Sequence, residues 1–137
     1  MTNRVFPKGK EGIMDGSIDL DTDDIRVMLV KSTYTYDSAD VFVSDLGAVD
    51  NGRSAQTLAT RTLTNGVFDA ANETLTATAA AASNALVLFK HTGVDGTARL
   101  IAYLDTVASG LPFTPAASQV CPITWDDGAN KIFAWGD

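Results

Sequence analysis

Short segments of β-type alternation, separated by turn residues, run through the chain from residue 57 to its end. The clearest turn is Asn65-Gly66, because both central positions of a type I′ hairpin require positive φ, which these two residues adopt readily. It predicts a hairpin between a strand over 57–64 and a return strand over 67–70. Turn residues recur roughly every 8 to 12 positions, a spacing typical of antiparallel sandwiches and barrels. The chain is therefore predicted to be mainly β, an antiparallel β-sandwich or barrel of about seven to eight strands.

Two apolar segments are predicted to form the centre of a sheet. The segments 84–92 and 97–106 are apolar on both faces and flank the turn sequence GVDG. Strict alternation places Ile101 on the face opposite Leu100 and Ala102. Further strands are expected over 25–31, 73–79, 119–125 and 131–136. Pro122 has no backbone N–H to donate, so its strand should lie at an edge or a bulge.

The N-terminal third is expected to contain one or two short helices. Residues 7–16 begin with Pro7, which suits a first helical turn, and Gly16 would end the helix. The segment 38–46 fits either a short helix capped by Ser38 or a strand, and we favour the helix. A strand over 25–31 follows, with apolar residues on both faces.

Length and charge limit what such a chain can do. With 137 residues it should form a single domain over 1–137. Its net charge of −7 argues against direct nucleic-acid binding and against an anionic membrane surface, since both need Lys and Arg. No apolar run approaches the length of a membrane span, and no secretory signal is visible. We expect synthesis in a cytoplasm.

Four aspartates precede the strand over 25–31, at Asp19, Asp21, Asp23 and Asp24. The first three match an EF-hand loop, but the sixth position is Asp24 instead of Gly and the twelfth is Val30 instead of Glu. A polar turn whose side chains accept hydrogen bonds from nearby amides is the favoured interpretation. Asp126 and Asp127, before Gly128, are interpreted in the same way, and no metal site is predicted.

No set of residues indicates catalysis. His91 is the only histidine, it falls at a strand end, and no G-x-S-x-G motif accompanies it. Cys121 is the only cysteine, so an intrachain disulfide is excluded, and a small buried residue in a strand is expected. We therefore predict no catalytic residue, no cofactor and no enzymatic activity.

Aromatic residues near the two termini are the candidate contact residues. Phe6, Trp125, Phe133 and Trp135 are either core residues or anchors of an interface with another subunit, since large aromatic side chains dominate contact energetics.

Three stretches resemble small structural proteins of tailed-bacteriophage virions. They are NRVFPKGKEGIMDGSIDLDTDDIRVMLV near the N-terminus, LIAYLDTVASGLPFTP, and WDDGANKIF near the C-terminus. The shared pattern is a short helix, an acidic turn, a two-faced strand and a C-terminal hairpin. The resemblance implies a β-rich, non-enzymatic protein of the head or tail, and it implies no catalytic or metal-binding residue.

The function expected from this resemblance is capsid decoration. Many copies would bridge major capsid subunits, or other virion subunits, and stabilise the shell through repeated contacts. A homo-oligomer located in the virion is expected. The alternatives are a tail or fibre-associated subunit and a carbohydrate-binding module in which Trp125, Trp135 or Tyr103 stacks on sugar.

Overall fold

A computed structural model describes residues 3–49, 55–76, 82–114, 119–126, 128 and 131–135. In this part of the chain, one α-helix, one 3₁₀ helix and ten strands are present. The elements are β1 (Arg4–Val5), α1 (Pro7–Met14), β2 (Ile25–Lys31), η1 (Val43–Val49, the 3₁₀ helix), β3 (Gln56–Thr57), β4 (Thr62–Thr64), β5 (Val67–Asp69), β6 (Glu73–Thr76), β7 (Ser83–Lys90), β8 (Leu100–Leu104), β9 (Val120–Ile123) and β10 (Phe133–Ala134).

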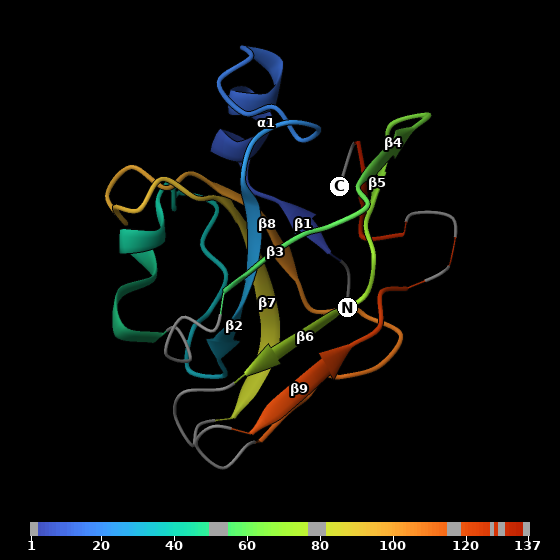
Figure 1. Ribbon diagram of the computed structural model, residues 1–137. Coiled ribbons are helices and arrows are strands. Elements are labelled where there is room, and N and C mark those ends of the chain that lie inside the picture. The colour runs from blue at the N-terminus through green and yellow to red at the C-terminus, as the bar shows by residue number, and fades with distance from the viewer. Residues whose placement is uncertain are drawn as a thin grey trace.

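The strands form three antiparallel sheets (Figure 1). A five-stranded sheet has the order β1-β8-β7-β2-β3, a three-stranded sheet has the order β10-β5-β4, and β6 pairs with β9. The two smaller sheets lie on one side of the large sheet, and η1 lies on the other. The predicted mainly β, sandwich-like fold is confirmed, with more and shorter strands than the seven or eight expected.

Apolar layers cover both faces of the large sheet. Toward the smaller sheets, Val27, Leu86 and Leu88 pack in a cluster that includes Phe68 and Ile123. On the opposite face, Met28 and Val87 pack with Val43 and Leu46 of η1. The two-faced patterns of 25–31 and 84–92 therefore predicted both strands, and the central position of β7 in the sheet is confirmed.

The alternation predicted for 97–106 is wrong at one position. The pairing register of β8 with β7 shifts between Leu88 and Phe89, which pair with Ala102 and Leu100 and leave Ile101 as the extra residue of a bulge. Ile101 and Ala102 consequently pack in the same cluster, on the side of the smaller sheets. A bulge of this kind does not change the apolar pattern, so alternation alone did not predict it.

The strand predicted over 57–64 is two strands. Thr60 has a φ of 52°, which interrupts the extended backbone. As a result β3 pairs with β2 in the large sheet, whereas β4 pairs with β5 in the three-stranded sheet. The hairpin at Asn65-Gly66 is confirmed, since these residues have φ values of 54° and 79°.

The helix favoured over 38–46 is displaced toward the C-terminus. Phe42 forms an antiparallel bridge with Arg99, and the 3₁₀ helix begins only at Val43. The carboxylate of Asp45 accepts hydrogen bonds from the amides of Val41 and Phe42, both at 2.8 Å. Asp45, and not Ser38, therefore accepts hydrogen bonds from the two amides that immediately precede this helix.

Several smaller expectations hold over shorter ranges. Pro122 lies in β9, whose only partner strand among the described residues is β6, so the predicted edge position is confirmed. The expected strand over 73–79 is β6 up to Thr76, and its last three positions lie outside the described residues. The last strand is limited to Phe133–Ala134.

Gly9 allows α1 to lie directly against β8. A Cβ atom at this position would be 2.7 Å from the carbonyl oxygen of Ile101 and 2.9 Å from that of Leu100. The Phe6 amide also donates to the Ile101 carbonyl at 2.8 Å. The backbone exposed by the bulge is thus covered by the start of the helix, and a larger residue at position 9 would separate the two elements.

We expect Gly9→Ala to destabilise the fold by about 1–3 kcal/mol, because the added methyl group meets backbone atoms that cannot move independently. Gly96→Ala is the matched control, since a Cβ atom there meets no atom within 4 Å. Urea unfolding of both variants measures the difference. Equal stability of the two variants would contradict the close packing of α1 on β8.

Candidate functional site

The structure places three of the four candidate contact residues in the interior. Phe6 is fully buried, Phe133 is 2% exposed and Trp125 is 4% exposed, whereas Trp135 is 50% exposed. The Trp125 indole also donates to the Ala71 carbonyl at 2.9 Å. The first three therefore act as core residues within this chain, and the interface hypothesis rests on Trp135.

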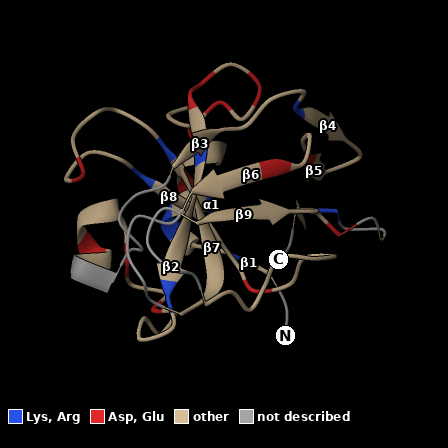
Figure 2. Ribbon diagram, turned by 60° about the horizontal axis from the view of Figure 1, so that its bottom comes forward, with Lys and Arg blue, Asp and Glu red and all other residues tan. Residues whose placement is uncertain are grey.

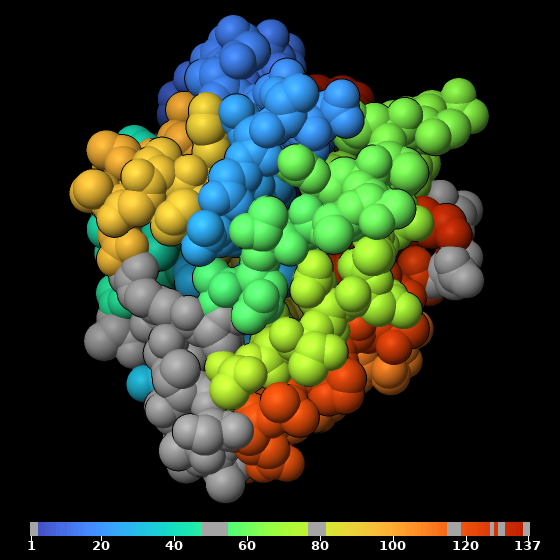
Figure 3. All heavy atoms as spheres, in the orientation of Figure 1, coloured from blue at the N-terminus to red at the C-terminus, as the bar shows by residue number. Residues whose placement is uncertain are grey.

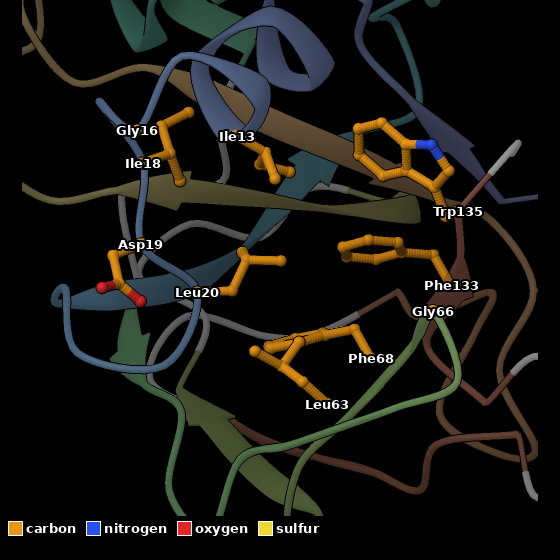
Figure 4. Close-up of a pocket in the computed structure, with 10 residues that line it drawn as sticks. All are labelled: Ile13, Gly16, Ile18, Asp19, Leu20, Leu63, Gly66, Phe68, Phe133 and Trp135. Atoms are coloured by element: carbon orange, nitrogen blue, oxygen red, sulfur yellow. The ribbon is translucent and has the colours of Figure 1, made fainter.

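Trp135 lies at one end of an apolar groove (Figure 4). The groove has a volume of about 440 Å³ and lies between α1 with its following loop and the three-stranded sheet. Asp19 carries the only charged side chain among the described residues that line it. The lining residues are Ile13, Gly16, Ile18, Asp19, Leu20, Leu63, Gly66, Phe68, Phe133 and Trp135.

The β-hairpin and the C-terminal strand form one wall of this groove. Phe68 of β5 pairs with Phe133 of β10, and their rings stack with centroids 5.2 Å apart. The Trp135 amide donates to the Gly66 carbonyl at 2.7 Å, which fixes the chain end against the hairpin turn. Phe68 and Phe133 are buried and form the floor of the groove, whereas Trp135 on its rim is half exposed.

Leu63 forms part of the open rim. This residue is 51% exposed, comparable to Trp135, and both are large apolar side chains facing the same groove. The β4–β5 hairpin that carries Leu63 projects from the body of the molecule (Figures 1 and 3). A projecting hairpin beside an apolar groove is an arrangement that another protein can contact without any change in the core.

The opposite wall is the aspartate-rich loop that precedes β2. The Asp19 carboxylate accepts hydrogen bonds from the amides of Asp21, at 2.9 Å, and Thr22, and the Asp23 carboxylate accepts from the Asp19 amide at 2.8 Å. Asp24 forms a salt bridge with Arg26. These contacts confirm the polar turn predicted for this segment.

Cations of this chain brace the same loop. The Arg61 guanidinium donates to the carbonyls of Leu20 and Asp23, at 2.9 and 2.6 Å. Lys90 lies 3.0 Å from the Asp23 carboxylate. Among the described residues, no group of three or more His, Cys, Asp or Glu side chains is arranged to hold a metal ion.

The pKa values of the loop carboxyls are lowered by these contacts. Hydrogen bonds from the Thr22 side chain and the Asp21 amide lower the pKa of Asp19, and the Asp19 amide together with Lys90 lowers that of Asp23. The Arg26 side chain lowers the pKa of Asp24. These three carboxyls are therefore ionised at neutral pH, with Arg61, Lys90 and Arg26 beside them.

The remaining singled-out residues have structural positions. Cys121 is fully buried in β9, as predicted, and burial raises the pKa of its thiol to about 11. His91 follows the end of β7, and its amide donates to the Asp24 carbonyl at 2.8 Å. Asp126 accepts a hydrogen bond from the Gly128 amide at 3.1 Å, in line with the predicted turn, whereas Asp127 lies outside the described residues.

A second surface feature, a cluster of tyrosines, was missed from the sequence. Tyr36 lies between Phe6 and Tyr103, with ring centroids 5.1 and 5.6 Å apart, and the Arg4 guanidinium lies 4.9 Å from the Tyr36 ring centroid. Tyr34 lies 6.0 Å from Tyr103 on the same side. The loop between β2 and η1 brings Tyr34 and Tyr36 to β8, and no local pattern predicts that placement.

The groove itself was also missed. Ile13 and Ile18 lie in segments interpreted as a helix end and a polar turn, whereas Leu63, Phe68, Phe133 and Trp135 lie in predicted strands that were not expected to face them. The groove lies between α1 and the β4–β5 hairpin, two elements that are distant in the sequence. The spacing of residues in the sequence does not predict that these two elements lie close together.

Over the described part of the chain, Figure 2 shows Lys and Arg scattered singly among Asp and Glu, without a continuous basic stripe. Within the same residues, no helix is long and apolar enough to cross a membrane. Comparison of the chain with known protein families, curated proteins and solved structures finds no match.

The acidic loop should make stability depend on pH. Carboxyls whose folded pKa lies below the ordinary value of 3.8 stabilise the fold fully above that pH, and the contribution is lost as the pH falls through the lowered pKa values. We expect the free energy of unfolding to be constant down to about pH 5 and to fall below about pH 4.

Asp23→Asn should lower stability at neutral pH and make the acid loss shallower, because the variant has no carboxylate to protonate there. Asp21→Asn is the matched control, since the Asp21 carboxylate accepts no hydrogen bond from a described residue. Urea titrations at several pH values measure both. An unchanged acid slope in Asp23→Asn would contradict this role.

Proposed function

We propose that the chain is a structural protein of a tailed-bacteriophage virion, a capsid decoration protein that binds neighbouring major capsid subunits and stabilises the head. The observation that carries the proposal is the open apolar groove with Trp135 and Leu63 on its rim. The sequence resemblance to virion structural proteins supports it independently. In this proposal the chain has no catalytic role.

The groove suits contact with a protein subunit. Trp135 is half exposed, and its amide donates to the Gly66 carbonyl, so little backbone freedom is lost when a partner covers it. A few residues, often Trp, supply most of the binding energy in protein interfaces. The net charge of −7 agrees with a location on the outer surface of the shell, away from packaged DNA.

Carbohydrate binding is the second candidate, and the tyrosine cluster is what favours it. Tyr34, Tyr36 and Tyr103 are partly exposed and lie close together, which is a usual arrangement for stacking on sugar rings. Trp125 is too buried to take part. Binding of the isolated chain to a glycan array, abolished by Tyr36→Ala, would favour this function over capsid decoration.

We expect the chain to co-purify with phage heads, and heads that lack it to lose resistance to heat. Trp135→Ser should weaken rebinding to such heads by about 2 kcal/mol, roughly thirty-fold in affinity, because one anchor of the contact is removed. Sedimentation of depleted heads with added protein measures the binding.

Val94→Ser is the matched control, since Val94 is 62% exposed and lies in the turn between β7 and β8, away from the groove. It should bind as the unmodified chain does. Equal binding of both variants would contradict the proposed role of the groove. Recovery of the chain only with tails would replace capsid decoration by the tail-associated alternative.

A further inference from the structure

The outer edge of β4 is an unpaired strand edge beside the groove. In the three-stranded sheet, β4 pairs with β5 on one side and is the last strand on the other, among the described residues. All three residues of β4 are exposed. Unpaired edges carry N–H and C=O groups that can pair with another extended chain.

The pairing register shows which backbone groups point outward. The pairs are Thr62 with Asp69, Leu63 with Phe68, and Thr64 with Val67 on either side of the two-residue turn. The Phe68 carbonyl accepts from the Ile132 amide, so the backbone groups of Phe68 face β10 and not β4. Hydrogen bonds alternate along antiparallel strands. The N–H and C=O of Leu63 therefore point away from the hairpin, toward the open edge.

Hollows flank this hairpin on both faces. On one face, Leu63 and Phe68 line the apolar groove. On the other, Thr62, Thr64 and Val67 line a second hollow of about 460 Å³, together with Asn65, Asp69 and Lys131. Successive side chains of a strand point to opposite faces. A strand added beside β4 would thus place alternate side chains toward the apolar groove and toward the polar hollow.

The charged residues beside this edge indicate which kind of segment would bind there. Asp19 lines the groove, and Asp21, two residues further along the same loop, is exposed. Neither forms a salt bridge with a described residue, and the Arg61 guanidinium nearby donates to the carbonyls of Leu20 and Asp23 instead. A segment that carries Lys or Arg beside its apolar residue would complement this wall. A second copy of the chain would bring a further net charge of −7, which disfavours self-pairing.

We propose that the outer edge of β4 binds an extended segment of a partner protein by antiparallel strand addition, with an apolar side chain beside Leu63, polar side chains beside Thr62 and Thr64, and a flanking Lys or Arg near the acidic loop. The inference deepens the proposed function and rests on it for the nature of the partner. Main-chain hydrogen bonds at Leu63 supply the affinity, and the two hollows supply the sequence preference.

A synthetic peptide tests the proposal on the full, isolated chain. The probe is a capped seven-residue peptide of alternating Thr and Val with Lys at both ends, titrated against ¹⁵N-labelled protein. We expect it to shift the amide signals of Thr62, Leu63 and Thr64 and to slow hydrogen exchange of the Leu63 amide at least ten-fold at saturation. A peptide with Glu in place of Lys should bind at least ten-fold more weakly.

Backbone methylation of the peptide distinguishes strand addition from simple apolar binding. The peptide residue opposite Leu63 has its side chain on the groove face and its N–H toward β4, so N-methylation of the Val residues should abolish binding. N-methylation of the Thr residues, whose N–H groups point away from β4, should leave binding unchanged. This comparison leaves the protein unaltered, so misfolding cannot produce the result.

Equal effects of the two methylations would overturn strand addition, and so would shifts that avoid β4. Self-association of the chain through β4 without peptide would identify a second copy as the occupant and overturn the proposed partner. If the peptide binds as expected but the chain is missing from virions, the proposed function fails and this inference stands. If the chain is in virions but methylation has no effect, the inference of strand addition fails and the proposed function stands.

Discussion

The antiparallel pairing of β7 with β2 on one side and β8 on the other is the interaction on which the rest of the structure depends. Leu86 and Leu88 point into the layer shared with the smaller sheets, and Val87 and Phe89 point into the layer beneath η1. Because β7 is buried on both faces and paired along both edges, its register fixes the neighbouring strands. A one-residue slip would exchange the two layers, so the register is strongly specified.

The bulge at Ile101 connects this central pairing to the surface. The shift in register of β8 turns Ile101 and Ala102 toward the same layer and leaves the Ile101 carbonyl available to the Phe6 amide. Gly9 then brings α1 against that backbone. The position of α1 in turn sets the loop with Ile18 and Asp19, which forms one wall of the groove. A local irregularity in the central sheet thereby positions the candidate site.

Strands that are buried on both faces could be predicted from the sequence, because their apolar pattern is determined locally. β2 and β7 are examples, and the turn at Asn65-Gly66 could be predicted because its residue types adopt positive φ. The interruption at Thr60 could not, since a threonine with positive φ is imposed by the division of one segment between two sheets. The groove and the contact of Tyr36 with Tyr103 depend on elements distant in the chain. Of the aromatic candidates, the sequence could not separate Trp135, at the chain end, from the buried Phe133 two residues earlier.

The central claim is that the groove and the outer edge of β4 form a contact surface for another subunit. A near-atomic cryo-electron microscopy map of the particle that carries this chain tests it most directly. We expect density from a neighbouring subunit over Trp135 and Leu63, with an extended segment running along β4. A map in which this chain is bound through another face, with Trp135 and the edge of β4 open to solvent, would contradict the account.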